Sequence, residues 1–365
     1  MTKAKQHELN YKRNGDISNR KDHFIPQFLL RNFAIEEADK NPGLVYIYKK
    51  FSKNSTKGSI AKHAGNETDF YLGKHTATKE LDKSCDDVYK EIEKSKYAPS
   101  VIKKVLEQDG EISLKYEEES VLATLVAHQF TRTRKFRKTI NKFLSFLLLN
   151  NFITKDDLGD KEKIQEVIVK NKFNISPKQI KSNYLLNYFS LSGIRGQELL
   201  VAIQIAESIV EEIYQKNLHT IITPENHYFI LSDAPVCIIG KNDELIEVNN
   251  FWSFKRDDGY SFILPISPKK AIVFGNNFKQ YGQITDISLA KSLVVMVNSL
   301  SVNNFNEEFY SHTDSFWSDY KNDLITPARL SIHRKISQEI QNNLFKRVKF
   351  FAKYGVWKLK KFLER

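Results

Sequence analysis

The sequence predicts an α+β fold, in which a large helical layer covers a small, mostly antiparallel sheet. Apolar residues recur with helical spacing through the middle of the chain, from about residue 78 to residue 218. Short alternating or apolar runs bounded by turn residues, which are typical of strands, occur before and after that middle part. Because strands bracket the helices, we expect one sheet built from N-terminal and C-terminal strands.

The first predicted element is a short helix near Pro26. Proline suits the first turn of a helix because its missing N–H removes no hydrogen bond there. Apolar side chains follow with the spacing of a buried helical stripe, at Phe28, Leu29, Leu30 and Phe33. After a turn signal at residues 41–43, the alternation of residues 44–48 predicts a strand, and an extended segment is expected at residues 66–72.

The remaining elements follow from the same patterns. Helices are predicted at residues 78–94, 98–108, 116–150, 160–171, 177–190 and 195–217. Beyond Pro224 the pattern predicts strands at residues 228–231, 236–239, 261–266 and 271–274, followed by helices at 286–301 and 316–363. We expect a disordered or loosely docked arm at residues 1–20, a single α+β domain at 21–330, and a basic amphipathic C-terminal helix at 331–365.

Positive charge favours polyanionic partners. The net charge is +12 and the isoelectric point is about 9.3. Residues 331–365 contain ten Lys or Arg against two Glu. A second run has no acidic residue, and its basic members are Arg132, Arg134, Lys135, Arg137, Lys138 and Lys142. These segments favour a polyanionic partner such as nucleic acid or an anionic membrane surface, although a lysine-rich surface without a binding role is the alternative.

The composition also indicates the compartment. Two cysteines, Cys85 and Cys237, cannot form a disulfide framework or a cysteine-based zinc site, so we expect the reducing cytoplasm. The polar N-terminus lacks the apolar core of a signal peptide. No apolar run reaches the roughly 18–20 residues needed to cross a bilayer. We therefore expect a cytoplasmic protein without integral membrane association.

Several landmarks of the chain resemble a known family. They are the run from His23 through Pro26 and Leu30 to Phe33, the segment from Glu67 to Tyr71, the run from Ala127 to Arg134, the run from Phe229 to Val236, and the Pro-rich turn from Leu264 to Pro268. In this order they resemble the bacterial domain of unknown function 4238. Two positions depart from its pattern, since Arg134 stands where proline is usual and His219 where tryptophan is usual. The resemblance implies an architecture and candidate site positions, and no reaction.

The polar residues of these landmarks are types that chemistry uses. His128 and Arg132 lie one turn apart on the inward face of the predicted helix that contains them. An unpaired buried charge is costly, so we expect these side chains to meet carboxylates, with Arg132 holding one of them bidentately. We expect the candidate catalytic residues to converge in one pocket, and they are His23, Glu67, Asp69, His128, Arg132 and Asp233. We expect contacts with substrate from Gln27, Gln129, Arg134, Arg137 and Lys138.

Two functions remain open. The first is a nuclease-like phosphodiesterase that acts on RNA or DNA, as a toxin or antiphage defence effector: histidine would move protons, arginine would hold phosphate, and carboxylates would orient imidazole or bind Mg²⁺ or Mn²⁺. The second is a non-enzymatic module that binds nucleic acid or a partner protein, in which the polar cluster is structural and Asp233 accepts backbone N–H bonds. P-loop, Rossmann, HExxH and GxSxG patterns are missing from the sequence, which disfavours the chemistries they serve.

Overall fold

The structure is a computed structural model with helices and mainly antiparallel sheets, which confirms the predicted α+β class. The described residues are 21–35, 43–50, 52, 54–68, 70–71, 73–74, 81–82, 84–94, 96–108, 112–137, 197–239, 245–246, 260–276, 282–284, 287–305, 307–320 and 324. The arm expected at residues 1–20, the helices expected at 160–171 and 177–190, and the C-terminal helix expected at 331–365 lie outside them.

The N-terminal part begins with the predicted short helix. Strand β1 (Lys21–His23) leads into α2 (Gln27–Arg31), for which Pro26 is the N-cap and which buries Leu29 and Leu30. Three strands follow, namely β2 (Leu44–Lys49), β3 (Ser55–Ser59) and β4 (Asn66–Thr68). Strands β1 and β4 form an antiparallel pair, in which His23 lies opposite Asn66. A second short pair consists of β5 (Gly73–Lys74) and β6 (Leu81–Asp82).

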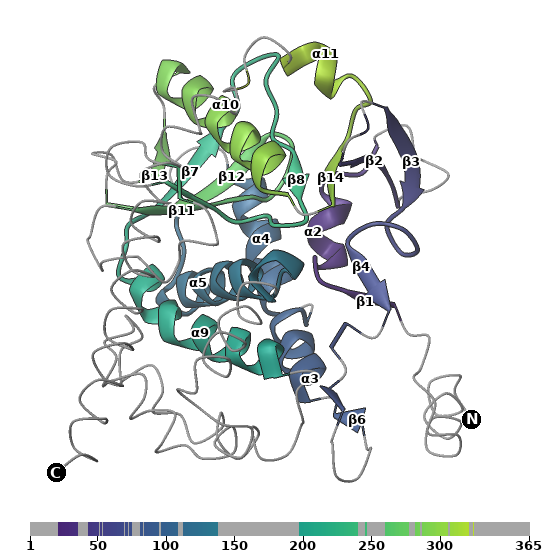
Figure 1. Ribbon diagram of the computed structural model, residues 1–365. Helices are drawn as coiled ribbons and strands as arrows, with labels where there is room; N and C mark the ends of the chain where they lie inside the picture. The colour runs from purple at the N-terminus through teal and green to yellow at the C-terminus, as the bar shows by residue number, and fades with distance from the viewer. Residues whose placement is uncertain are drawn as a thin grey trace, which may run out of the picture.

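The helical layer consists of α3 (Ser84–Ile92), α4 (Ala98–Glu107), α5 (Tyr116–Thr131) and α9 (Gln197–Tyr214). Helices α5 and α9 pack along each other (Figure 1). Helix α5 ends well before residue 150, the predicted end. The reason is local: Arg132 is the C-cap of α5, and the Thr133 Oγ1 accepts a hydrogen bond from the Phe136 N–H at 3.2 Å. A threonine that accepts such a bond begins a new helical turn, so it separates α5 from the residues that follow.

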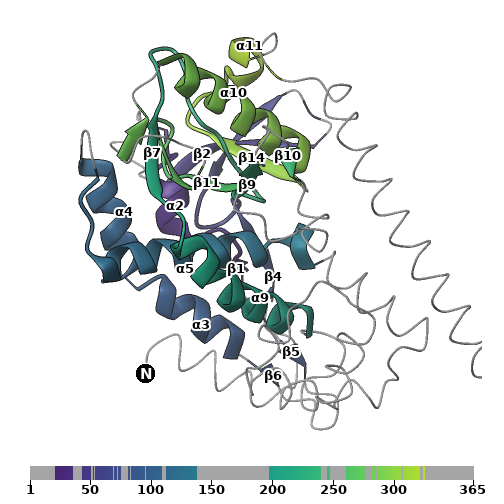
Figure 2. The ribbon, with the colours of Figure 1, turned by 90° about the vertical axis from the view of Figure 1, so that its left-hand side faces the viewer.

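The described strands form two larger sheets, where we expected one from the sequence. The six-stranded sheet has the order β10-β9-β11-β12-β7-β13, and only β13 pairs in parallel. Its strands are β7 (Leu218–Ile222), β9 (Cys237–Ile239), β10 (Leu245–Ile246), β11 (Ser261–Pro265), β12 (Lys270–Phe274) and β13 (Gly282–Ile284). It lies between α10 (Ile287–Asn304) and the layer of α4, α5 and α9 (Figures 1 and 2).

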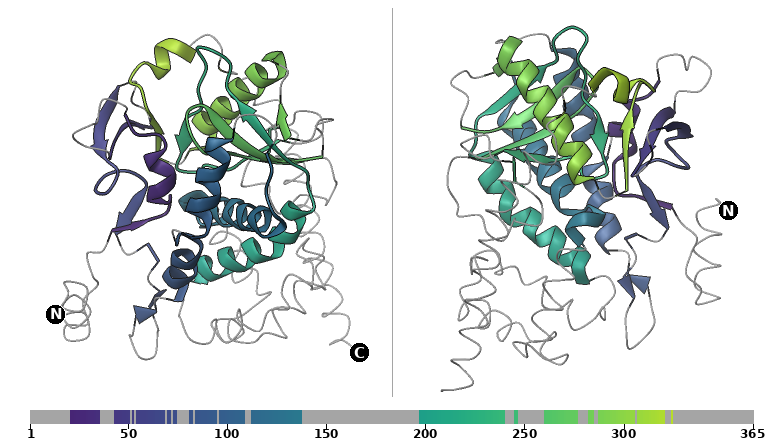
Figure 3. Two further views of the ribbon diagram at one scale, coloured as in Figure 1. Left: turned by 180° about the vertical axis from the view of Figure 1, so that it is seen from behind. Right: turned by 45° about the horizontal axis from the view of Figure 1, so that its top comes forward.

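The four-stranded sheet joins the two ends of the described chain. Its order is β3-β2-β14-β8, all antiparallel. The N-terminal strand β2 therefore pairs with β14 (Glu308–Ser311), which in turn pairs with β8 (Leu231–Ser232). This is the predicted union of N-terminal and C-terminal strands. Helix α11 (Phe316–Tyr320) packs at its end through Phe316, whose ring meets those of Tyr48 and Phe309. Figure 3 shows β2 and β3 on the side of the molecule away from α9.

Of the strand that we predicted at 228–231, only Leu231 lies in a strand, namely β8, and residues 228–230 precede it without strand pairing. Asn298 of α10 takes the place of a neighbouring strand there. Its side-chain amide donates to the Tyr228 carbonyl at 2.8 Å, and its side-chain oxygen accepts the Ile230 N–H at 3.1 Å. The Tyr320 hydroxyl and the Pro268 carbonyl bond further backbone groups of this buried segment. Its backbone is thus satisfied by distant residues, which a pattern of strand-forming residues cannot reveal.

No helix among the described residues is both long enough and apolar enough to span a lipid bilayer.

The Lys270 side chain ties the six-stranded sheet to the helical layer. Its buried ammonium donates hydrogen bonds to the carbonyl oxygens of Val105, Leu106 and Gln108 at 3.0, 3.2 and 2.8 Å. These carbonyls end helix α4, where the last turn leaves acceptors without helical partners and the helix dipole is negative. One lysine therefore satisfies a helix end that would otherwise be buried without partners.

We predict that Lys270→Met lowers the free energy of unfolding by about 2–4 kcal/mol, because it strands buried carbonyls and removes charge-assisted bonds. The matched control is Lys269→Met, which changes the neighbouring, exposed lysine and should stay within about 0.5 kcal/mol. Urea unfolding of the three proteins measures the difference. Equal losses in both variants would contradict the role given to Lys270.

Candidate functional site

The Arg132 side chain lies at the end of α5 and is 1% exposed. Its Nη1 pairs with the Glu93 carboxylate at 2.5 Å, and its Nη2 donates to the main-chain carbonyl of His23. The guanidinium also lies over the rings of Tyr89 and Tyr71, with its carbon 4.6 and 5.5 Å from the ring centroids. A buried charge is tolerated when it is paired and hydrogen-bonded in this way.

The carboxylate partner of Arg132 differs from our expectation. We expected Glu67, Asp69 or Asp233, and we expected a bidentate pair, but the partner is Glu93, which contacts one nitrogen of the fork. Glu93 follows α3, four residues after Tyr89, and its N–H donates to the Tyr89 carbonyl. Helical spacing places positions four apart on one face, so the pair Tyr89 and Glu93 was the available signal in the sequence.

The His23 residue contributes its main chain to this cluster. Its carbonyl accepts hydrogen bonds from the Arg132 guanidinium and from the Tyr71 hydroxyl, the latter at 2.6 Å. The preceding Asp22 carboxylate accepts the Tyr71 N–H at 3.0 Å. Strand β1 is therefore held to the end of α5 through the His23 carbonyl, and to Tyr71 through that carbonyl and Asp22.

The His128 imidazole is 3% exposed and meets the edge of the Tyr89 ring, with centroids 5.7 Å apart. Burial, reinforced by the positive charge of Arg132, lowers the pKa of His128 to about 3. The ring is therefore neutral at physiological pH. A general base or acid works best when its pKa lies near the working pH and when it can reach the substrate.

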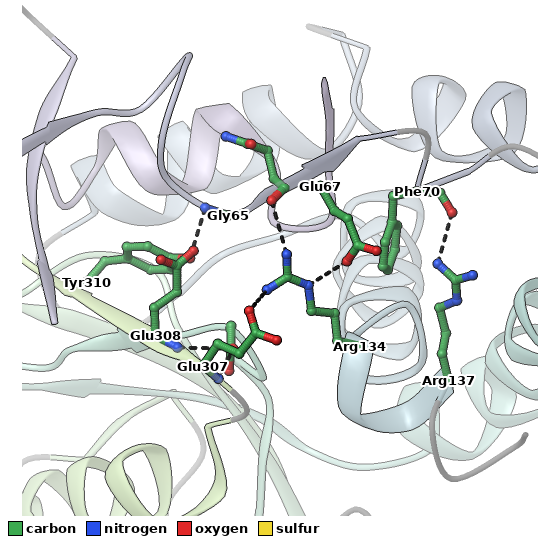
Figure 4. A network of polar contacts seen from close by, with 10 residues as sticks. Gly65, Glu67, Phe70, Arg134, Arg137, Glu307, Glu308 and Tyr310 are labelled. Carbon is green, nitrogen blue, oxygen red and sulfur yellow. Dashed lines mark hydrogen bonds and ion pairs between the residues drawn. The ribbon is translucent and has the colours of Figure 1, made fainter. Parts of the chain in front are cut away.

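A second cluster centres on Arg134 and is more open to solvent (Figure 4). Arg134 Nε donates to Glu67 at 2.6 Å, its Nη1 pairs with Glu307, and its Nη2 donates to the Asn66 carbonyl at 3.3 Å. The guanidinium lies 4.8 Å from the centroid of the Phe24 ring. The side chains of Glu67 and Glu307 are 43% and 57% exposed. Arg134 thus bridges β4 to the start of β14.

The Asp233 carboxylate holds that same start of β14 from the other side. Its Oδ2 accepts the backbone N–H groups of Glu307 and Glu308 at 2.7 and 3.2 Å, and the Asp233 N–H donates to the Glu308 carbonyl at 3.0 Å. The turn after β8 is closed by Ser232, whose hydroxyl bonds both polar backbone groups of Ala234. Asp233 accepts hydrogen bonds from backbone N–H groups, as the non-enzymatic hypothesis expects, but the donors belong to the start of a strand more than 70 residues away in the sequence.

The other candidate residues have these positions. Gln27 accepts a bond from Arg31 at 3.1 Å, and Gln129 is fully buried. Arg137 donates to the Phe70 carbonyl at 2.9 Å and lies over the Phe70 ring at 4.3 Å (Figure 4). Asp69 and Lys138 lie outside the described residues.

The two arginine clusters are neighbours, because His23 and Asn66, whose carbonyls they contact, lie opposite each other in the β1–β4 pair. The structure thus brings His23, His128 and Arg132 together, and connects Glu67 and Asp233 through Arg134 and Glu307. Among the described residues, no group of three or more His, Cys, Asp or Glu side chains is arranged to hold a metal ion. Cys237 is buried, which raises the pKa of its thiol to about 12 and leaves it a poor nucleophile.

Comparison with known proteins gives one match. The model of a family described as "Protein of unknown function (DUF4238)" matches residues 21–315, which agrees with the resemblance seen in the landmarks. No curated protein and no solved structure matches the chain.

The depressed pKa of His128 makes the stability of the fold depend on pH. The unfolded chain binds this proton near pH 6.5 and the folded chain only near pH 3. The stabilisation is therefore complete above the unfolded pKa and is lost as the pH falls toward the folded value. We predict that this one group lowers the free energy of unfolding by roughly 2 kcal/mol between pH 7 and pH 5.

The measurement is urea unfolding of the wild type and of His128→Gln at several pH values. The difference in stability between the two proteins should shift in favour of the variant as the pH falls. A difference that does not change between pH 7 and pH 5 would show that His128 is accessible to protons in the folded state.

Proposed function

We propose that this chain, which belongs to the DUF4238 family, binds nucleic acid through its surface without cutting it, and that its buried histidine and arginine network is structural. The structural role of the histidine and arginine network is inferred from the burial of His128 and Arg132. The binding of nucleic acid is inferred from the positions of the surface lysines.

The geometry argues against phosphodiester cleavage by the residues that we considered. An arginine that clamps phosphate has to reach it, yet Arg132 is enclosed by Glu93, the His23 carbonyl and two tyrosine rings. A catalytic histidine has to exchange protons near neutral pH, whereas His128 stays neutral down to about pH 3. Asp233 uses a carboxylate oxygen to accept backbone N–H groups. Each of these contacts stabilises the fold.

The charge of the chain is distributed unevenly. The described residues carry equal numbers of acidic and basic side chains, so the net charge of +12 comes from the rest of the sequence. Residues 331–365 are the most basic part of that remainder. Within the described part, some stretches depart from the balance. Residues 131–137 contain no Asp or Glu, but Arg132 and Arg134 are paired with carboxylates there. Residues 43–66 also contain no Asp or Glu, and their described lysines are Lys49, Lys50, Lys57 and Lys62.

The described residues of this stretch (43–50, 52 and 54–66) comprise the antiparallel pair β2 and β3 and the segment after it, and we call them the lysine hairpin. Strand β3 is the edge of the four-stranded sheet, and Lys49, Lys50, Lys57 and Lys62 are exposed. Tyr46 of β2 lies opposite Lys57 in the register, and the Lys57 ammonium is 5.3 Å from the centroid of the half-buried Tyr46 ring.

Lysines protect edge strands from unwanted pairing in many proteins. A lysine beside an accessible ring also provides a phosphate contact and a stacking surface, which together favour single-stranded nucleic acid.

We predict that Lys57→Ala/Lys62→Ala weakens binding of a labelled single-stranded RNA roughly tenfold, since two phosphate contacts of about 0.7 kcal/mol each are lost. The slope of log K against log salt should become shallower by about 0.7 for each contact. Fluorescence anisotropy at several salt concentrations measures both quantities. The matched control, Lys103→Ala/Lys291→Ala, removes the same charge from α4 and α10 and should bind like the wild type.

The same RNA, and a DNA of the same sequence, are incubated with the protein and Mg²⁺ or Mn²⁺ and then sized on a gel. Intact substrate is expected. Cleavage that is lost in His128→Gln would instead support the nuclease that the sequence led us to consider, while failure of the wild type to bind either nucleic acid would reject the proposed function outright.

A further inference from the structure

The last turn of α5 contains buried polar atoms that have no hydrogen-bond partner within the described part of the chain. They are both side-chain amide atoms of Gln129, Nδ1 of His128, Oγ1 of Thr131 and Nε of Arg132. Gln129, His128, Thr131 and Arg132 are 0%, 3%, 0% and 1% exposed. Most buried polar groups in folded proteins are hydrogen-bonded, so a concentration of this kind in one helical turn requires an explanation.

Three of these four residues, namely His128, Gln129 and Arg132, lie on one face of the helix. At about 100° per residue, His128, Arg132 and Gln129 occupy an arc of roughly 100°, and Arg132 lies between the other two. Positions three and four apart are neighbours on a helix surface, so Arg132 adjoins both. Phe130 points away from this arc, and its ring meets that of Phe262 in β11. The polar arc therefore faces away from the six-stranded sheet, on the side where His128 and Arg132 meet Tyr89 of α3.

The chemistry of the arc is mixed. The Arg132 Nε–H and the Gln129 amide nitrogen need acceptors, whereas the Gln129 oxygen needs a donor. The neutral His128 ring offers a donor or an acceptor at Nδ1, according to its tautomer. Few ligands serve such a set of buried donors and acceptors. Water does serve it, because each water molecule both donates and accepts and typically makes about three hydrogen bonds in a protein interior.

We infer that the side chains of His128, Gln129 and Arg132 border an enclosed site that binds ordered water. The water accepts from Arg132 Nε–H and donates to the Gln129 oxygen, and thereby completes the coordination of the buried guanidinium. Gln129 would then orient the water that Arg132 requires, and it would have no direct contact with nucleic acid. This inference is independent of the proposed function.

The test compares the wild type with Gln129→Met by ¹⁷O magnetic relaxation dispersion, which detects water molecules that stay inside a protein for longer than its tumbling time. Methionine has a similar volume but cannot hold the water, so we expect the variant to lose at least one long-lived molecule. The control is Leu122→Met, a substitution of similar size two turns earlier in α5, which should leave the dispersion unchanged. Equal dispersion in the wild type and Gln129→Met overturns the inference.

If Gln129→Met does not fold, a high-resolution crystal structure of the wild type tests whether water occupies this site. A water peak within hydrogen-bond distance of a Gln129 amide atom and of Arg132 Nε supports the inference. Direct protein partners for these atoms, or apolar side chains packed against them with no peak, overturn it.

Discussion

The pairing of the buried Arg132 guanidinium is the constraint on which the arrangement of the N-terminal part depends. A guanidinium in a protein interior loses its hydration, and acceptors and ring faces have to replace the water. Arg132 obtains them from separate parts of the chain: Glu93 after α3, the His23 carbonyl of β1, and the rings of Tyr71 and Tyr89. The helical layer and the β1–β4 pair therefore have to meet at the end of α5 for the charge to be stabilised.

Arg134 and Asp233 extend this connection to the C-terminal strands. Arg134 joins Glu67 of β4 to Glu307, and Asp233 accepts the N–H groups at the same start of β14. Strand β14 then pairs with β2, so the polar contacts and the four-stranded sheet reinforce one another. The lysine hairpin lies beyond this junction, on an edge that the junction positions. In the proposed function, Arg134 and Asp233 hold the strands in place, and surface lysines contact the nucleic acid.

Much of the fold is predictable because it depends on local patterns. The stripe after Pro26 and the alternation from Leu44 to Tyr48 identify α2 and β2. Strand β3 escaped prediction because an edge strand, here Ser-Thr-Lys-Gly-Ser, needs no apolar alternation. A Cβ at Gly58 would lie 2.4 Å from Ile47 Cδ1, so a larger residue there would displace the end of the Ile47 side chain. Strand β14 was missed because it is short and its partners lie far away in the sequence.

In the candidate site too, the features that depend on local sequence spacing were predictable, and the contacts between distant parts of the chain were not. Helical spacing placed His128 and Arg132 on an inward face, and both side chains are buried. The spacing cannot reveal which carboxylate reaches Arg132, because Glu93, Glu67 and Asp233 are brought to their positions by tertiary contacts. It also cannot distinguish a buried, neutral histidine from an accessible one, since the pKa of His128 depends on desolvation in the folded state.

The most direct test of the structural role of Arg132 is to measure the stability and the RNA affinity of Arg132→Lys side by side. Lysine keeps the charge but lacks the planar fork that contacts Glu93 and the His23 carbonyl together. We predict that the free energy of unfolding falls by about 2–4 kcal/mol, while the folded variant binds RNA within about twofold of the wild type. Loss of RNA binding, or of any cleavage, at unchanged stability would contradict the account and would make Arg132 a functional residue.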